Sequence, residues 1–118
     1  MKFELRDRTK RFAIRIVKLI KKFPPDVAGR ELGTQLIRSG TSIGANLEEA
    51  DAGSSRKDFL HKTAISYKET KESRYWLEVI LDAEVLSDDA SIQEVKVLQA
   101  EAIELSKIFW TILNKRKE

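Results

Sequence analysis

The 118-residue chain contains no cysteine and one histidine, together with two prolines and five glycines. Without cysteine the chain has no disulfide bridge, no thiol nucleophile and no thiolate metal ligand. Because His61 is the single histidine, a metal site built from several histidines is also excluded. No apolar run approaches the ~20 residues of a membrane span, and the first residues lack a signal-peptide core. We therefore expect a cytoplasmic protein without a cofactor, a metal site or a membrane segment.

Apolar residues recur at the spacing of an α-helix, and strand-like alternation is missing. The pattern is interrupted by residues that end or cap helices: Pro24-Pro25, Gly53 followed by Ser55, and Ser87 before two aspartates. These breaks predict four helices, over approximately residues 4–23, 27–52, 56–85 and 88–115. Four helices with short connections indicate an all-α fold, an antiparallel up-down four-helix bundle, as one domain over residues 1–118.

Positive charge is concentrated at the start of the chain, although the net charge is only +3. Residues 1–30 carry ten basic and three acidic side chains, and the rest of the chain is mildly acidic. Five basic residues at steps of three and four form one stripe: Arg8, Arg11, Arg15, Lys18 and Lys22. The stripe is centred roughly 90° from the apolar row, so we expect it to face solvent. It is a candidate surface for phosphate contacts with little sequence choice, and a solvated basic face is the alternative.

The third predicted helix has more apolar residues than one face needs. If its core row is Ile65, Trp76, Val79 and Ala83, a second apolar face lies about 130° away. A second apolar face requires a partner, so we expect a homo-oligomer larger than a coiled-coil dimer. The candidate interface residues on the first and third helices are Ile14, Val17, Phe59, Leu77 and Leu81. A broad core stripe with scattered exposed apolar residues is the alternative.

The second predicted helix contains three internal glycines, each about 1 kcal/mol less favourable than alanine. Gly33, Gly40 and Gly44 fall on one edge of the helix, which predicts close approach of a neighbouring helix. An irregular helix is the alternative interpretation of these glycines.

A polar row borders the apolar stripe of the second helix, and charged residues interrupt the core row of the third. A charge in such a stripe is unfavourable unless it is paired. We therefore predict an interhelical network in which Arg38 or Lys68 meets Glu72, while Asn46 bonds locally. The network would fix the register of the helices rather than line a site, and it does not imply catalysis. Its predicted members are Gln35, Arg38, Asn46, Glu49, Lys68 and Glu72.

The run QLIRSGTSIGANLEEA at residues 35–50 resembles the signature helix of a bacterial four-helix-bundle family. The founding members of that family are encoded in intervening sequences of the 23S ribosomal RNA gene. Further matches, which extend the resemblance over nearly the whole chain, are Phe23-Pro24, SRKDF at 55–59, KETKES at 68–73 and YWL at 75–77.

The resemblance implies a ring-like homopentamer. A similar bundle is the accessory protein of diversity-generating retroelements, which binds nucleic acid and a reverse transcriptase through a positive surface. Most members have no known function, and no catalytic residue is carried over.

Three functional hypotheses follow, in decreasing order of support. The first is a homo-oligomeric scaffold, a pentamer by resemblance, that binds RNA or DNA through the basic first helix. The second is an adaptor that binds a protein, such as a reverse transcriptase, and no nucleic acid. The third is a ribonuclease, because Arg56 and His61 have the R-x4-H spacing of a helical ribonuclease family. That short pattern arises often by chance, and Lys57 departs from it, so we predict that the protein is not an enzyme.

Overall fold

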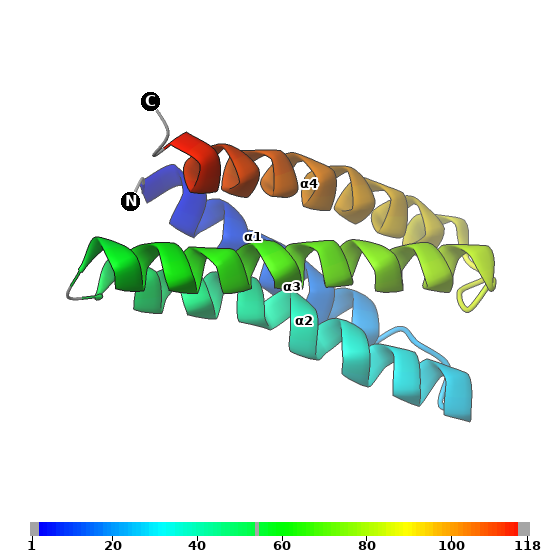
Figure 1. The fold of residues 1–118 in the computed structure, drawn as a ribbon. Coiled ribbons are helices and arrows are strands. Elements are labelled where there is room, and N and C mark those ends of the chain that lie inside the picture. Colours follow the sequence, from blue (N-terminus) through cyan, green and yellow to red (C-terminus); the bar gives the residue numbers. More distant parts are fainter. Residues whose placement is uncertain (1–2, 54, 116–118) are drawn as a thin grey trace.

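The computed structural model describes residues 3–53 and 55–115. It contains four helices: α1 (Phe3–Ile20), α2 (Val27–Asp51), α3 (Arg56–Asp82) and α4 (Asp89–Asn114). The helices run alternately up and down, and each packs against the next, while α4 returns beside α1 (Figure 1). No strand occurs in residues 3–53 or 55–115. The predicted all-α four-helix bundle is confirmed.

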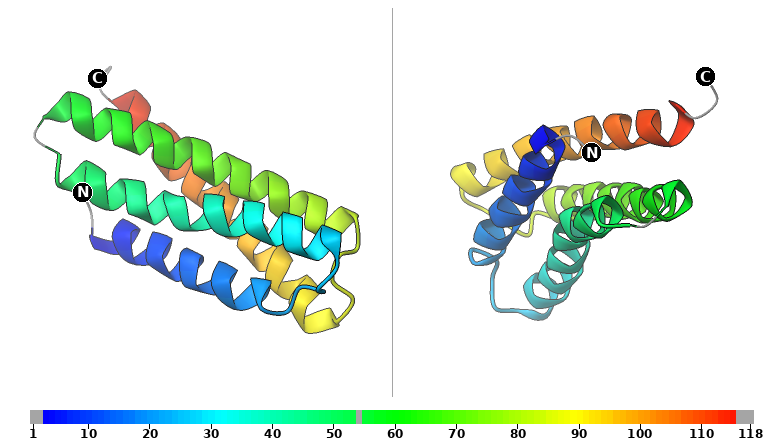
Figure 2. Two further views of the ribbon diagram at one scale, coloured as in Figure 1. Left: turned by 90° about the horizontal axis from the view of Figure 1, so that it is seen from below. Right: turned by 90° about the vertical axis from the view of Figure 1, so that its left-hand side faces the viewer.

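The four helices do not pack equally tightly. The most extensive contact is between α2 and α3, and the smallest is between α1 and α4. Figure 2 shows that α4 lies close to α1 near the α1–α2 turn and diverges from it toward the end that holds both termini. The side of the bundle between α1 and α4 is therefore open at the end that holds the two termini.

Side-chain caps begin the last three helices. Asp26 accepts a hydrogen bond from the Gly29 N–H at 2.7 Å, and Ser55 accepts one from the Asp58 N–H at 3.1 Å, as predicted for that residue. Asp88, rather than Ser87, caps α4 by accepting from the Ser91 N–H at 2.9 Å.

The predicted ends of α1 and α3 are each three residues too long. After Ile20 the chain tightens into bonds that span three residues, from Lys22 N–H to Leu19 O and from Phe23 N–H to Ile20 O, both 3.0 Å. The prolines that follow prevent a further helical turn.

A Schellman motif ends α3 at Asp82. The Val85 N–H donates to Ile80 O and the Glu84 N–H donates to Leu81 O, each at 3.2 Å. The motif requires a left-handed residue, and Glu84 adopts φ 55° there, the one positive φ of a non-glycine residue in the described ranges. An ordinary side chain thus occupies a position that favours glycine.

The buried positions of the helices follow steps of three and four, the pattern of a left-handed bundle, and α2 buries Ser39 in addition, beside Gly40. In α1, α2 and α4 this row is largely apolar, as the helical spacing of apolar residues in the sequence predicted. In α3 the prediction is wrong, because the helix turns a row rich in hydroxyl groups inward. The buried residues of α3 are Thr63, Ser66, Thr70, Ser73, Leu77 and Ile80.

The hydroxyl groups of this row are satisfied within the α2–α3 seam. Ser66 donates to the carbonyl of Ile43 on α2 at 2.8 Å, and Ser73 donates to Ser39 Oγ at 2.9 Å. Thr70 donates to the Ser66 carbonyl of its own helix at 2.7 Å. Because these side chains are small and hydrogen-bonded, they can be buried without an unpaired polar group.

The glycines of α2 face α1, which confirms the predicted close approach. A Cβ at Gly40 would lie 3.1 Å from Ile16 Cγ1, and one at Gly44 would lie 3.2 Å from Thr9 Oγ1. Larger residues on this edge of α2 would push α1 away.

Candidate nucleic-acid interface

The basic stripe of α1 is divided between two environments. Arg8 forms a bidentate pair with Glu101 of α4, at 3.0 and 2.7 Å, and Arg15 forms one with Glu94, at 2.8 and 2.7 Å. The two arginines are seven residues apart and so are the two glutamates, so the pairs repeat along the antiparallel α1–α4 contact. The stripe faces solvent for the most part, since Arg15 is exposed and Arg8 is half-buried, but the charges of these two arginines are paired by α4.

These pairs also shift the acid–base equilibria of the arginines. The hydrogen bonds that Arg8 and Arg15 donate to Glu101 and Glu94 raise the pKa of each arginine above the ordinary value. Arg6 behaves in the same way on the other side of α1. Its hydrogen bonds to Glu48 of α2 raise its pKa, and Asp51 adds a smaller contribution. Three arginines of α1 thus connect it to both neighbouring helices.

The lysines of α1 and of the turn that follows it differ from these arginines. Lys10, Lys18, Lys21 and Lys22 are exposed, and in the described part of the chain none has an ion pair within 4 Å. The pKa of the Asp88 carboxyl is lowered mainly by the hydrogen bond from the Ser91 N–H, and the charge of Lys22 adds a smaller contribution. Arg11 is also exposed and pairs with Asp7 of its own helix at 3.1 Å.

The predicted network between α2 and α3 forms around Arg38. Its guanidinium pairs with Glu72 and, at 3.5 Å, with Glu69. Glu72 also accepts a hydrogen bond from Trp76 Nε1 at 3.0 Å. The prediction for Arg38 is confirmed, whereas Lys68 is exposed and takes no part in an ion pair with another described residue.

Two further predicted members of the network between α2 and α3, Asn46 and Glu49, also form hydrogen bonds or ion pairs. Asn46 donates to the Ser42 carbonyl of its own helix at 2.8 Å, the predicted local bond. Glu49 pairs with Lys62 of α3 at 2.7 Å. Gln35 is half-buried and forms no side-chain hydrogen bond to another described residue.

The candidate oligomer residues are scattered over the bundle. Leu77 has no exposed surface and belongs to the core, so it is not an interface residue of this chain; its position follows from the inward rotation of the hydroxyl row. Leu81 packs against the core as well. Ile14 is 43% exposed, while Val17 and Phe59 are half-buried.

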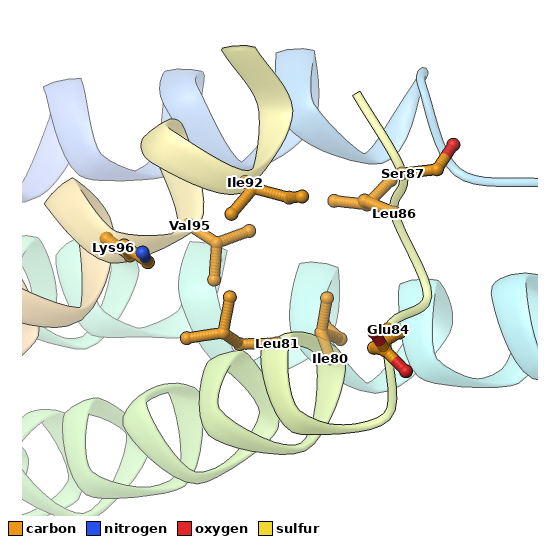
Figure 3. A pocket seen from close by; sticks show the side chains of 8 residues that line it. All are labelled: Ile80, Leu81, Glu84, Leu86, Ser87, Ile92, Val95 and Lys96. Carbon is orange, nitrogen blue, oxygen red and sulfur yellow. The ribbon is translucent and has the colours of Figure 1, made fainter. Parts of the chain in front are cut away.

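Leu81 lines a hollow of about 520 Å³ between the end of α3 and the start of α4 (Figure 3). Apolar side chains from both helices point toward one another across it, whereas the carboxylate of Glu84 and the hydroxyl of Ser87 point away. The hollow is therefore an edge of the core with no converging polar groups. Its lining residues are Ile80, Leu81, Glu84, Leu86, Ser87, Ile92, Val95 and Lys96.

A larger groove of about 710 Å³ lies where α1 and α4 diverge. All four helices contribute to its apolar lining, which includes Phe59. The apolar residues are Leu5, Leu47, Phe59, Ile108 and Ile112. Polar side chains such as Glu104 and Lys107 form its rim. An apolar surface with a polar rim is typical of a protein contact.

Two aromatic residues that the sequence patterns did not single out share another part of the surface. Tyr67 of α3 and Trp110 of α4 line one hollow of about 370 Å³. Trp110 directly follows the core residue Phe109, so a tryptophan beside the apolar row was the available signal. Tyr67 gave no comparable signal, because its position relative to α4 depends on the packing.

The residues of the ribonuclease pattern, Arg56 and His61, are both exposed on the first turns of α3. In residues 3–53 and 55–115 no group of three His, Cys, Asp or Glu side chains is placed to hold a metal ion. None of the described helices combines the length and the apolar character needed to cross a membrane.

Comparison with known proteins agrees with this architecture. Residues 1–111 match the family model of the 23S rRNA-intervening sequence protein. The fold is similar to the crystal structure of a protein of unknown function from the S23 ribosomal protein family of Bacteroides thetaiotaomicron VPI-5482. The two chains are 34% identical with a TM-score of 0.79, over 93% of this chain and 98% of that one. A comparison with curated proteins finds no match. From the bundle, the motif of α2 and the match over residues 1–111, the chain belongs to the family of 23S rRNA-intervening sequence proteins.

Proposed function

We propose that the protein is a cytoplasmic helical scaffold that assembles into a homopentamer and binds RNA or DNA without sequence preference. The observation that carries the binding is the set of exposed lysines on α1 and in the turn that follows it: Lys10, Lys18, Lys21 and Lys22. Unlike Arg8 and Arg15, they are not neutralised by α4. Lysines that project from a helix attract phosphates of any sequence, and several copies in one assembly would add their contacts.

The groove where α1 and α4 diverge supports self-assembly. Its apolar lining is drawn from all four helices, and Phe59, one of the residues expected at an interface, is part of it. Contact with a second copy would remove this apolar surface from water. The same groove favours the alternative function, an adaptor that binds a different protein such as a reverse transcriptase.

Fluorescence anisotropy of a labelled RNA and a matched DNA, titrated at low and near-physiological salt, tests the binding. We expect both to bind at low salt and to dissociate steeply as salt rises. Lys18→Gln/Lys21→Gln should lower the magnitude of the salt slope by about 2, one for each lost phosphate contact. The matched control Lys57→Gln/Lys96→Gln removes two exposed charges from α3 and α4 and should leave binding unchanged. Absence of binding at low salt would contradict the proposal and favour the adaptor.

Light scattering tests the assembly. We expect the mass of five 13.5 kDa chains for the wild type. Phe59→Asp should reduce that mass, because it places a charge in the groove. Val27→Asp is the control, since Val27 is 67% exposed and lies outside the groove. A monomeric wild type would contradict the assembly.

That the protein is not an enzyme stays a prediction. RNA cleavage that is lost in both Arg56→Ala and His61→Ala would overturn it.

A further inference from the structure

The outer surface of the α3–α4 pair presents two aromatic side chains beside each other. Trp110 is 56% exposed, and Tyr67 is half-buried and packed against the core. Both line the same shallow hollow, together with Ser106, Lys107 and Thr111. Since each ring is held by a different helix, the two rings are positioned by the packing of the bundle. Such a pair offers flat apolar faces to a planar ligand.

The charges around this pair are predominantly positive. Lys71 Nζ lies 5.3 Å from the centre of the Tyr67 ring, and Arg74 follows one turn later on the same side of α3. Both are exposed, and neither has an ion pair with another residue of the described ranges. Lys107 adds a third positive charge from α4, although it pairs with Glu104 at 3.3 Å.

Two acidic residues of the same part of α3 are turned away from this surface, whereas Glu78 is exposed about one turn beyond Arg74 on the same side. Glu69 and Glu72 pair with Arg38, on the side of α3 that faces α2. On α4, Glu101 pairs with Arg8 and thus faces α1. The pairing of acids on the other sides of the helices leaves the surface around Tyr67 and Trp110 positive, which favours an anionic ligand.

We propose that this aromatic–basic face, defined by Tyr67, Lys71, Arg74 and Trp110, binds single-stranded RNA or DNA. Unpaired bases stack on the exposed Trp110, while Lys71, which lies over the Tyr67 ring, and Arg74 contact the neighbouring phosphates. Stacking of this kind accepts every base and requires that the base is not already paired and stacked in a duplex. The inference rests on the proposed function and adds to it a preference for single strands.

A second copy of the chain is a less suitable occupant of this face. Two copies that met through it symmetrically would bring Lys71 and Arg74 close to their own equivalents, and like charges repel. A polyanion with planar bases matches both the charge and the exposed rings.

The test compares a labelled, non-self-complementary single strand with a duplex of the same sequence, by anisotropy against the full-length protein. Trp110→Ala should weaken binding of the single strand about fivefold or more, and binding of the duplex less than twofold. Tyr75→Ala is the matched control. Tyr75 is 55% exposed on α3, packs edge-on against Trp76 and lies outside the hollow, so its replacement should leave both affinities unchanged.

Tryptophan fluorescence gives a second readout. The chain has two tryptophans, and Trp76 is hydrogen-bonded to Glu72 away from this face. A base stacked on Trp110 should quench its emission. The quench should persist in Trp76→Phe and disappear in Trp110→Phe. Because phenylalanine keeps an aromatic ring at position 110, disappearance of the quench in this variant reports loss of the indole rather than loss of folding.

Each alternative outcome is distinguishable when the mass of every variant is measured by light scattering. If Trp110→Ala reduces the mass and weakens both nucleic acids equally, the face is a contact between copies and the inference is wrong. If both nucleic acids bind wild type and Trp110→Ala equally well, the inference fails while the proposed function stands. If the wild type binds neither, the proposed function itself fails.

Discussion

The two arginine–glutamate pairs between α1 and α4 are expected to stabilise the least extensive contact of the bundle. Arg8–Glu101 and Arg15–Glu94 are bidentate, with side-chain exposures of 32% and 27% in the first pair and 43% and 30% in the second. Exposed ion pairs contribute 0.2–1 kcal/mol in general, and bidentate geometry places these near the upper end, at about 0.5–1 kcal/mol each. Replacing both arginines should therefore reduce the free energy of unfolding by about 1–2 kcal/mol.

Thermal and urea unfolding of Arg8→Gln/Arg15→Gln, at one protein concentration, measures this loss. With an unfolding entropy of about 2.1 cal/mol/K per residue, the melting temperature of a 118-residue chain should fall by about 4–8 °C. The control Arg11→Gln/Lys18→Gln removes the same charge from the outer side of α1 and should lower the melting temperature by about 2 °C or less. The difference between the variants should shrink in 1 M salt.

Equal stability of the two double variants would refute the reasoning, because it would mean that the α4 glutamates contribute nothing. A double-mutant cycle on Arg15 and Glu94 provides an independent check, and a coupling energy of zero would lead to the same conclusion. In the anisotropy assay, Arg15→Gln/Glu94→Gln should keep its affinity for nucleic acid, because removing both partners of the ion pair leaves the net charge of the surface unchanged.

Two further predictions concern the helix ends. Glu84→Gly should raise the free energy of unfolding by about 1 kcal/mol and the melting temperature by about 4 °C, because glycine removes the strain of the left-handed residue. Glu84→Ala, which keeps a Cβ, should show no such gain, and equal stability of the two variants would count against this explanation. The hydrogen bond from the Ser91 N–H lowers the pKa of Asp88. The stabilising effect of this carboxylate is therefore complete above the unfolded-state pKa of about 3.9 and is lost as the pH falls through the lower folded-state value. Asp88→Asn should therefore lose less stability than the wild type between pH 5 and pH 2 in urea titrations, and an equal loss in both proteins would contradict the role of Asp88.

The sequence was sufficient to predict the number, order and approximate bounds of the helices, because three of the four core rows are apolar at helical spacing. It was not sufficient for α3. There the inward row contains Thr63, Ser66, Thr70 and Ser73, and a search for apolar residues selects the wrong face. The hydroxyl groups are tolerated inside because carbonyl and hydroxyl partners lie within reach, and those partners are evident only once α2 and α3 are docked.

For the basic stripe on α1, the sequence also predicted the position of the side chains but not their ion-pair partners. The spacing of Arg8, Arg11 and Arg15 correctly places them on one stripe, but it does not reveal which of them reaches an acid on another helix. The partners of Arg15 and Arg8 are 79 and 93 residues away in sequence. Only the fold separates the arginines that connect helices from the lysines that remain available.

The hydroxyl-rich seam between α2 and α3 also bears on the order in which the bundle opens. These two helices are adjacent in sequence, share the most extensive contact and exchange hydrogen bonds inside it, whereas α1 and α4 diverge over part of their length. Amide hydrogen exchange should accordingly be slowest along α2 and α3, and α1 and α4 should exchange through partial opening while the central hairpin remains folded. A hairpin of this kind needs only local chain closure to form, so the same contact that resists opening is also available early when the chain folds.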